Sequence, residues 1–164
     1  MSKNNTVTAG VWRNPVHLLA FGLGAGLMPV APGTFGTLVA LPLYYFLQGL
    51  ASVWYLLLVA GMFVAGIALC ARTARDLRTP DHSGIVWEEI VGYLVTMFMA
   101  PTGWVWMLLG FLLFRLFDVW KPFPIRWLDN NVHGGLGIML DDVAAGAAAA
   151  LVLQGVYWIW MLNS

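Results

Sequence analysis

The sequence confines almost all of its charge to two short windows. Fourteen of the sixteen charged residues lie within residues 72–89 and 115–142, and the segments 14–71, 90–114 and 143–164 contain no Asp, Glu, Lys or Arg. Charged side chains are costly in hydrocarbon, so long uncharged apolar segments are typical of transmembrane helices. The chain is 60% hydrophobic and 10% charged, whereas a soluble domain carries roughly a quarter charged residues. The sequence therefore predicts an all-α, polytopic membrane protein.

About five crossings fit the uncharged segments, because a helix needs about 20 apolar residues to span a hydrocarbon core of about 30 Å. The predicted crossings are 34–49, 53–71, two within 86–118 that are divided at 101–103, and one from 143 to about 162. Residues 15–28 are short and rich in glycine, and we expect a short N-terminal interfacial or re-entrant helix there. The expected organisation is a polar N-terminal tail (1–13) and a single membrane-embedded domain (14–164).

This layout predicts that both charged windows lie on one side of the membrane, because the chain crosses an even number of times between them. The intervening turns at 49–52 and 101–103 carry no charge. The positive-inside rule then makes the charged side cytoplasmic. With a formal net charge of zero and no basic tract, the chain lacks the electrostatic features of a nucleic-acid-binding protein.

Two pairs of adjacent carboxylates, Glu88-Glu89 and Asp141-Asp142, each stand next to a predicted apolar helix. Adjacent like charges repel, and a helix N-terminus offsets only about 0.3–1 kcal/mol per charge. A divalent cation would stabilise them much more. Because clustered His and Cys are absent from the sequence, oxygen ligation favours Mg²⁺, Mn²⁺ or Ca²⁺ over zinc. We expect a metal site in preference to solvated loop charges.

Arg115, Asp118 and Lys121 repeat at a spacing of three, which places them on one face of a helix. They are interpreted either as a ladder of salt bridges or as a phosphate clamp around a metal ligand. Two glycine-rich segments, 29–37 with Thr34 and 133–137 with His133, are either turns or loops that direct backbone N–H groups at a phosphate.

Several spaced segments together resemble the bacterial phosphatidylglycerophosphatase A family. They occur in the family's order, cover most of residues 12–146, and comprise residues 12–19, 32–37, 81–92, 115–124 and 131–146. Several independent motifs make the resemblance more specific than any one glycine-rich loop. One departure is Glu88, which stands where the family more often has Asp.

The resemblance implies a Mg²⁺-dependent lipid phosphatase of the bacterial inner membrane. Its substrate would be phosphatidylglycerophosphate, its products phosphatidylglycerol and inorganic phosphate, and its active site would face the cytoplasm. On this basis the expected metal ligands are Asp81, Glu88, Glu89, Asp141 and Asp142. The expected catalytic carboxylates are Asp81, Glu89, Asp118 and Asp142. The expected phosphate-binding residues are Arg115, Lys121, Arg126, Thr34 and His133.

Two alternative functions are weighed against this hypothesis. A CDP-alcohol phosphotransferase-like enzyme would need an Asp-Gly-x-x-Ala-Arg run, which the sequence lacks. A small transporter or ion channel would place carboxylates at mid-membrane depth, whereas the carboxylates here are expected at helix ends. Asp129 and Arg78 are expected to be bystanders in the charged windows.

Overall fold

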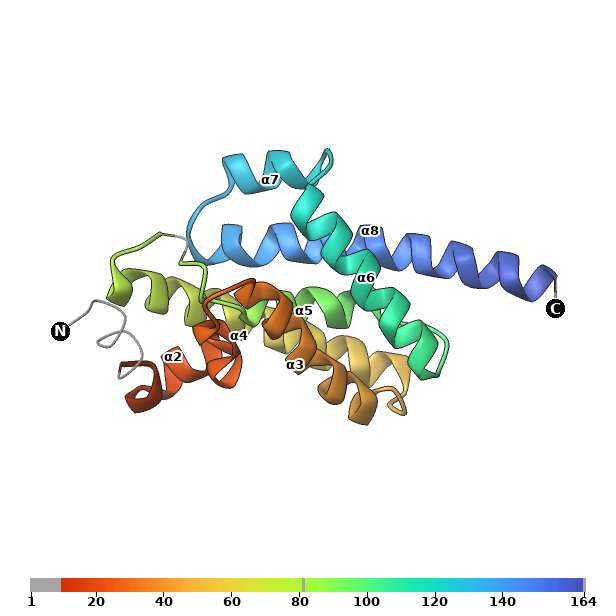
Figure 1. Cartoon of the computed structure of the whole chain (residues 1–164), viewed down its shortest axis with the longest axis horizontal. Helices are drawn as coiled ribbons and strands as arrows, with labels where there is room; N and C mark the ends of the chain where they lie inside the picture. Colours follow the sequence, from red (N-terminus) through yellow and green to blue (C-terminus); the bar gives the residue numbers. More distant parts are fainter. Residues whose placement is uncertain (1–9, 81, 164) are drawn as a thin grey trace.

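The computed structural model describes residues 10–80 and 82–163, and over these residues it contains helices and no strand (Figure 1). The prediction of an all-α fold is confirmed. Residues 1–9 of the expected tail, and Asp81, lie outside the described residues. After a helical segment at residues 10–13, the helices are α2 (Pro15–Ala20), η1 (Gly22–Leu27), α3 (Pro32–Leu47), α4 (Ser52–Leu77), α5 (Trp87–Thr96), α6 (Trp104–Trp120), α7 (Ile125–Asn131) and α8 (Gly134–Leu162).

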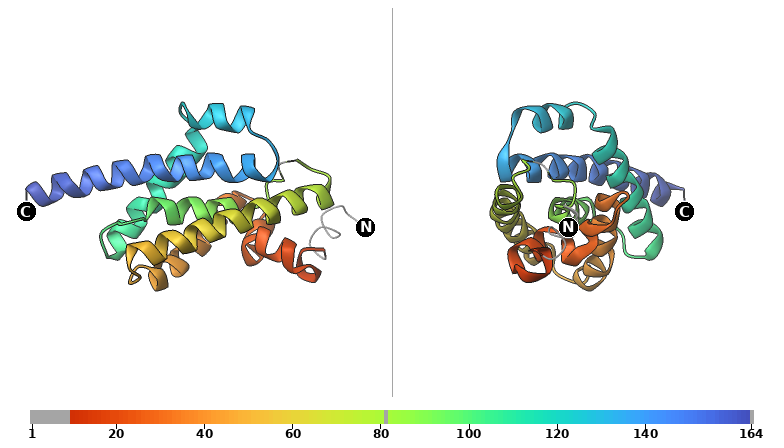
Figure 2. Two further views of the ribbon diagram at one scale, coloured as in Figure 1. Left: turned by 180° about the vertical axis from the view of Figure 1, so that it is seen from behind. Right: turned by 60° about the vertical axis from the view of Figure 1, so that its left-hand side comes forward.

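The longer helices alternate in direction, so their connections gather at two ends of an elongated bundle. In Figures 1 and 2, α3, α5 and α8 run one way and α4 and α6 run the other way. The uncharged turns at 48–51 and 97–103 therefore lie at one end, with the C-terminus. The charged connections at 78–86 and 121–133 lie at the other end. This arrangement agrees with the expectation that both charged windows share one side.

Two helices, α4 with 26 residues and α8 with 29, are long and apolar enough to cross a membrane. The helices α3 and α6 have 16 and 17 residues. The ten residues of α5 span only about 15 Å at 1.5 Å per residue, which is half of the hydrocarbon core. The number of crossings therefore stays a prediction.

The last helix begins nine residues earlier than expected, at Gly134 in place of Val143. The glycines at the start of this helix are typical of a loop, but two of them allow other parts of the backbone to pack closely against the helix. A Cβ on Gly135 would overlap the carbonyl oxygen of Ile67, and one on Gly137 would overlap that of Val132. The expectation that the Asp141-Asp142 pair precedes this helix is therefore wrong, because the pair lies about two turns inside α8.

Side chains from neighbouring helices cover the carbonyl groups where α5 stops. The Tyr55 hydroxyl donates to the Leu94 carbonyl at 2.7 Å, and the Gln154 amide donates to the Met99 carbonyl at 2.8 Å. Backbone polar groups within a bilayer need partners inside the protein. These two hydrogen bonds allow a short helix to end within the bundle.

We expect Tyr55→Phe to lower the free energy of unfolding by about 1–2 kcal/mol, because it leaves a buried carbonyl without its hydrogen bond. Chemical unfolding in detergent micelles measures this change. The matched control is Tyr45→Phe, since the Tyr45 ring is 61% exposed. Equal stability of the two variants would show that the Tyr55 hydroxyl does not support the end of α5.

The N-terminal part of the chain packs against the charged end of the bundle. Residues 10–13 are helical and Val11 is fully buried, so this part of the expected tail belongs to the core. The imidazole of His17 in α2 lies 3.0 Å from the Asp76 carboxylate of α4. Leu23 and Gly24 adopt left-handed backbone conformations that break the helix at η1. The interfacial or re-entrant placement of residues 15–28 stays a prediction.

Candidate active site

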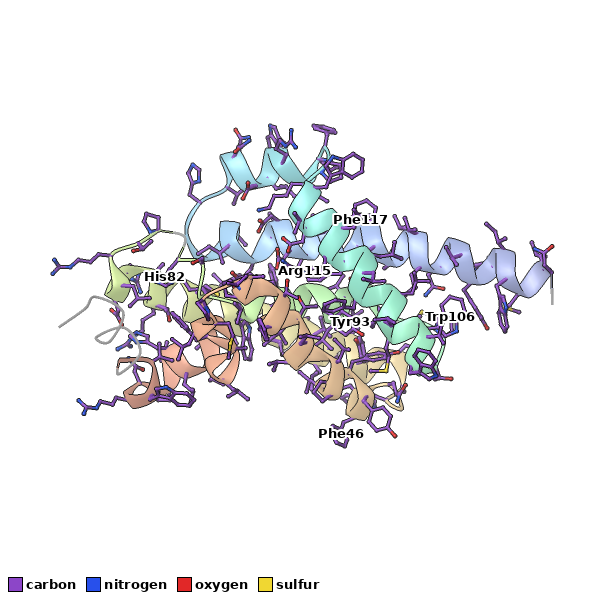
Figure 3. The ribbon with its side chains drawn as sticks, viewed as in Figure 1. Phe46, His82, Tyr93, Trp106, Arg115 and Phe117 are labelled. Atoms are coloured by element: carbon purple, nitrogen blue, oxygen red, sulfur yellow. The ribbon has the colours of Figure 1, made fainter. Side chains whose placement is uncertain are left out.

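A pocket of about 400 Å³ opens at the charged end of the bundle. The starts of three helices (α3, α5 and α8), the end of α6, and α7 all contribute to it. Figure 3 shows Arg115 between α6 and α3, within this region. The charged side chains that line the pocket are Glu88, Glu89, Arg115, Asp118, Lys121, Asp129, Asp141 and Asp142.

Three helix N-termini converge on the pocket and favour negative charge there. The α3 helix begins at Pro32 after Ala31 in the left-handed conformation, and α8 begins after His133. Glu88 and Glu89 lie in the first turn of α5. Unpaired N–H groups and the helix dipole make such termini suitable for anions, phosphate included. The backbone therefore favours both the glutamates and a phosphate ligand.

Close packing of α5 on α8 brings the glutamates and aspartates together. A Cβ on Gly146 would overlap the carbonyl oxygen of Gly92, and a Cβ on Gly92 would lie 2.8 Å from the carbonyl oxygen of Asp142. On α5, Gly92 follows Glu89 by three residues, and on α8, Gly146 follows Asp142 by four. These spacings put each glycine on the same helix face as its carboxylate. The two small residues thus direct Glu89 and Asp142 into one pocket.

Three carboxylate oxygens are buried without a hydrogen-bond partner among the described residues. They are Glu89 Oε2, Asp141 Oδ1 and Asp142 Oδ2. A buried carboxylate without compensation is costly. The pocket is therefore short of positive charge.

Each of the two cations in the pocket contacts two carboxylates. Arg115 Nη1 donates to Asp118 Oδ2 at 2.5 Å and lies 4.0 Å from Glu89 Oε1. Lys121 Nζ donates to Asp129 Oδ1 at 2.8 Å and to Asp141 Oδ2 at 2.6 Å.

The contacts of Lys121 keep its ammonium group charged. Burial lowers the pKa of Lys121, but hydrogen bonds to Asp129 and Asp141 outweigh it, and the pKa is raised above the ordinary value. The carboxylates hold Arg115 and Lys121 at the pocket. There the two positively charged side chains are suitable partners for a phosphate group.

The structure brings most of the predicted site residues together. Glu88, Glu89, Asp118, Asp141, Asp142, Arg115, Lys121 and His133 all line the pocket. Thr34 and Arg126 do not line it: the Thr34 backbone N–H donates to the Ala31 carbonyl, and the Arg126 guanidinium donates to the Trp120 carbonyl at 3.2 Å. The individual roles of all these residues stay predictions.

Asp129 is expected from the sequence to be a bystander, but the structure places it at the pocket. Asp129 lines the pocket and accepts a hydrogen bond from Lys121. The two residues are separated by Pro122 and Pro124, so no helical periodicity in the sequence links them. Arg78, the other expected bystander, caps the end of α4 and does not line the pocket.

We expect Asp129→Asn to raise KM by up to about tenfold with a smaller change in kcat, because Lys121 loses one of the two charged hydrogen bonds that position it. Steady-state kinetics of lipid dephosphorylation measure both constants. Asp129→Glu keeps the charge and should recover part of the lost affinity. An unchanged KM in Asp129→Asn would show that Asp141 alone positions Lys121.

The donors in the pocket suit a hard divalent cation. The unpartnered side-chain atoms of the pocket-lining residues are all carboxylate oxygens, which Mg²⁺ prefers as ligands. Within the described part of the chain, no group of three His, Cys, Asp or Glu side chains is arranged to hold a metal ion. Asp81, a predicted ligand, lies outside this part. The type of donor atom therefore suits Mg²⁺, and the presence of a metal site stays a prediction.

The structure defines a helical protein that has two helices long and apolar enough to cross a membrane and an acidic pocket at one end of its bundle. A model of the family described as phosphatidylglycerophosphatase A matches residues 18–157. The chain belongs to this family, as the resemblance predicted, and it is an enzyme of the phosphoric monoester hydrolase class.

Curated relatives resemble the chain over most of its length. Phosphatidylglycerophosphatase A of Escherichia coli is 47% identical over 92% of this chain and 88% of the relative. Phosphatidylglycerophosphatase A of Haemophilus influenzae is 42% identical over 99% of this chain and 100% of the relative. A putative phosphatidylinositol-3-phosphatase of Bacteroides thetaiotaomicron is 32% identical over 87% of this chain and 93% of the relative. No solved structure matches the chain.

Proposed function

We propose that this chain removes the terminal phosphate from phosphatidylglycerophosphate, giving phosphatidylglycerol and inorganic phosphate, and that it requires Mg²⁺. The proposal extends the activity named for two relatives to this chain. The observation that carries it is the set of three buried, unpartnered carboxylate oxygens in a pocket that also contains Arg115 and Lys121. Such a pocket suits a metal ion together with a phosphate dianion.

Glu89, Asp141 and Asp142 would hold the metal ion, with Asp81 and Glu88 as the further ligands that the sequence predicts. When bound, Mg²⁺ supplies positive charge that stabilises a phosphoryl group during transfer. Arg115 and Lys121 would bind the non-bridging oxygens of the phosphate, because cations stabilise the charge that these oxygens carry. The N-termini of α3 and α8 would add backbone N–H groups on the same side.

The location of the pocket suits a lipid substrate. Large apolar side chains remain exposed along α4, α6 and α8, including Leu57, Leu112 and Leu151, as expected of surfaces that face acyl chains. The pocket lies at the charged end of the same helices. A phospholipid could therefore keep its acyl chains in the bilayer while its phosphate enters the pocket. We propose that this end faces the cytoplasm of the bacterial inner membrane.

The test is phosphate release by the purified chain in detergent micelles that contain phosphatidylglycerophosphate. Release should require Mg²⁺, stop when a chelator is added, and return when Mg²⁺ is restored. Lys121→Gln should lower the rate, whereas Arg78→Gln, a change at an exposed residue outside the pocket, should not. Phosphate release that persists in chelator would show that the enzyme does not require a metal ion. The absence of release under all of these conditions would show that phosphatidylglycerophosphate is not the substrate.

A second lipid substrate belongs in the same assay. The relative named as a putative phosphatidylinositol-3-phosphatase is 32% identical, and its named substrate is also a lipid phosphomonoester. Phosphatidylinositol 3-phosphate should be hydrolysed more slowly than phosphatidylglycerophosphate, because the two nearer relatives carry the other name. A faster rate on the inositol lipid would reverse this assignment.

A further inference from the structure

The short helix α7 presents two different faces. Toward the bundle, Ile125 is 1% exposed and Asp129 reaches Lys121 at the pocket. The outward face carries Arg126, Trp127 and Asn130, which do not line the catalytic pocket. Figures 1 and 2 show α7 on the outside of the bundle, beside the first half of α8.

The outward face borders a groove of about 520 Å³ that is rich in aromatic side chains. It is lined by Trp120, Pro122, Phe123, Arg126, Trp127, Asn130 and Asn131. Phe123 is 84% exposed, Trp120 61% and Trp127 54%. Rings that join an apolar body to a polar edge are enriched where a bilayer meets water. Their exposure here fits contact with lipid better than contact with bulk water.

Arg126 supplies this groove with a positive charge. One of its guanidinium nitrogens donates to the Trp120 carbonyl. This hydrogen bond holds the guanidinium group beside the aromatic rings. A guanidinium group has five N–H donors and binds phosphate in a bidentate manner. Among the described residues, no carboxylate lies within ion-pair distance of Arg126. The charge of the groove is therefore complementary to an anionic head group.

The connections of α7 place this groove at a membrane surface. The segment follows Trp120 at the end of α6 and precedes α8, which is long and apolar enough to span the bilayer. We infer that the groove is a second lipid site, separate from the catalytic pocket, that binds the phosphate of an anionic phospholipid in the surrounding bilayer. The inference goes beyond the proposed function and depends only on insertion of the chain into a membrane.

The test uses photocrosslinking of the full chain in lipid vesicles. The variant Phe123→benzoylphenylalanine is reconstituted with phosphatidylcholine and a minor fraction of phosphatidylglycerol, illuminated, and the attached lipids are identified by mass spectrometry. Phosphatidylglycerol should be enriched about fivefold over its share of the vesicle, the effect expected for one cation at an anionic surface. A probe at the opposite end of the bundle, Trp104→benzoylphenylalanine, should show no enrichment.

Three results would overturn the inference. Enrichment that persists in Arg126→Gln, with Arg78→Gln as the matched control, would show that Arg126 does not select the lipid. A probe at Phe123 that attaches to no lipid would show that the groove does not face the bilayer. Loss of enrichment when inorganic phosphate is added would show that the groove takes a free anion in place of a head group. None of these measurements requires turnover, so failure of the proposed phosphatase activity would be recognised separately.

Discussion

Asp142→Asn is expected to lower kcat for phosphate release by at least about 1,000-fold, which corresponds to about 4 kcal/mol of transition-state stabilisation. Asparagine has nearly the same size as aspartate but lacks the charge that a metal ligand needs. Asp142 is 4% exposed, and one of its oxygens has no partner among the described residues. The variant should therefore lose the charge without opening a cavity.

The same substitution should make the protein more stable in the absence of divalent metal. Asp142 shares its pocket with Glu89, Asp118 and Asp141, and removal of one of several buried like charges relieves both repulsion and desolvation. A gain of about 1–3 kcal/mol is expected, similar to the gain seen when buried ion pairs are replaced by uncharged residues of similar volume. Thermal unfolding in chelator, compared with thermal unfolding in Mg²⁺, measures this gain.

Asp76→Asn is the matched control for Asp142→Asn. Asp76 lies outside the pocket, contacts His17 and Arg72, and has a side chain that is 42% exposed. The variant should keep its activity and lose at most about 1 kcal/mol of stability. An active Asp142→Asn enzyme would exclude Asp142 as a ligand, and an inactive variant that is also destabilised would point to a structural role.

The arrangement of charge could be predicted from the sequence because it depends on a property of whole segments. Long uncharged apolar segments predict helices. Two such helices between the charged windows bring the chain back to the side from which it started. The position of Glu88-Glu89 was also predicted correctly, since the pair lies in the first turn of α5. A local pattern was sufficient in both cases.

Features that depend on tertiary contacts could not be predicted in this way. The predicted start of α8 is wrong because Gly135 and Gly137 favour a loop by composition, whereas both lie in the helix in close contact with the Ile67 and Val132 carbonyls. The seven-residue helix α7 is too short to show a periodic pattern, so Asp129 was not recognised.

The observed start of α8 bears on the alternative of a transporter or ion channel. Carboxylates at helix ends are not suited to an ion path, but Asp141 and Asp142 lie within α8. Membership of a hydrolase family now decides between the two functions. A helix-interior position is also compatible with catalysis, because the pocket extends from the helix starts to these two residues.

Gly33→Ala is expected to lower kcat/KM by about 100-fold, because small displacements of catalytic groups have effects of this size. Gly33 lies in the first turn of α3 and lines the pocket. A Cβ at this position would overlap Glu89 Oε1 and would lie 3.1 Å from Arg115 Nη1. Both side chains would have to move, and the Arg115 contact with Glu89 would change with them. Overpacking of this kind also costs about 1–3 kcal/mol of stability.

Gly61→Ala separates the local overlap from a general effect of adding a methyl group. Gly61 lies within α4, and a Cβ there meets nothing within 4 Å. This variant should keep full activity and gain roughly 0.5–1 kcal/mol, since alanine is the better helix former. Measurement of kcat/KM and of unfolding for both variants distinguishes the two effects. If Gly33→Ala were as active as Gly61→Ala, the α3 N-terminus would not position Glu89 and Arg115, and these two side chains would depend on α5 and α6 alone.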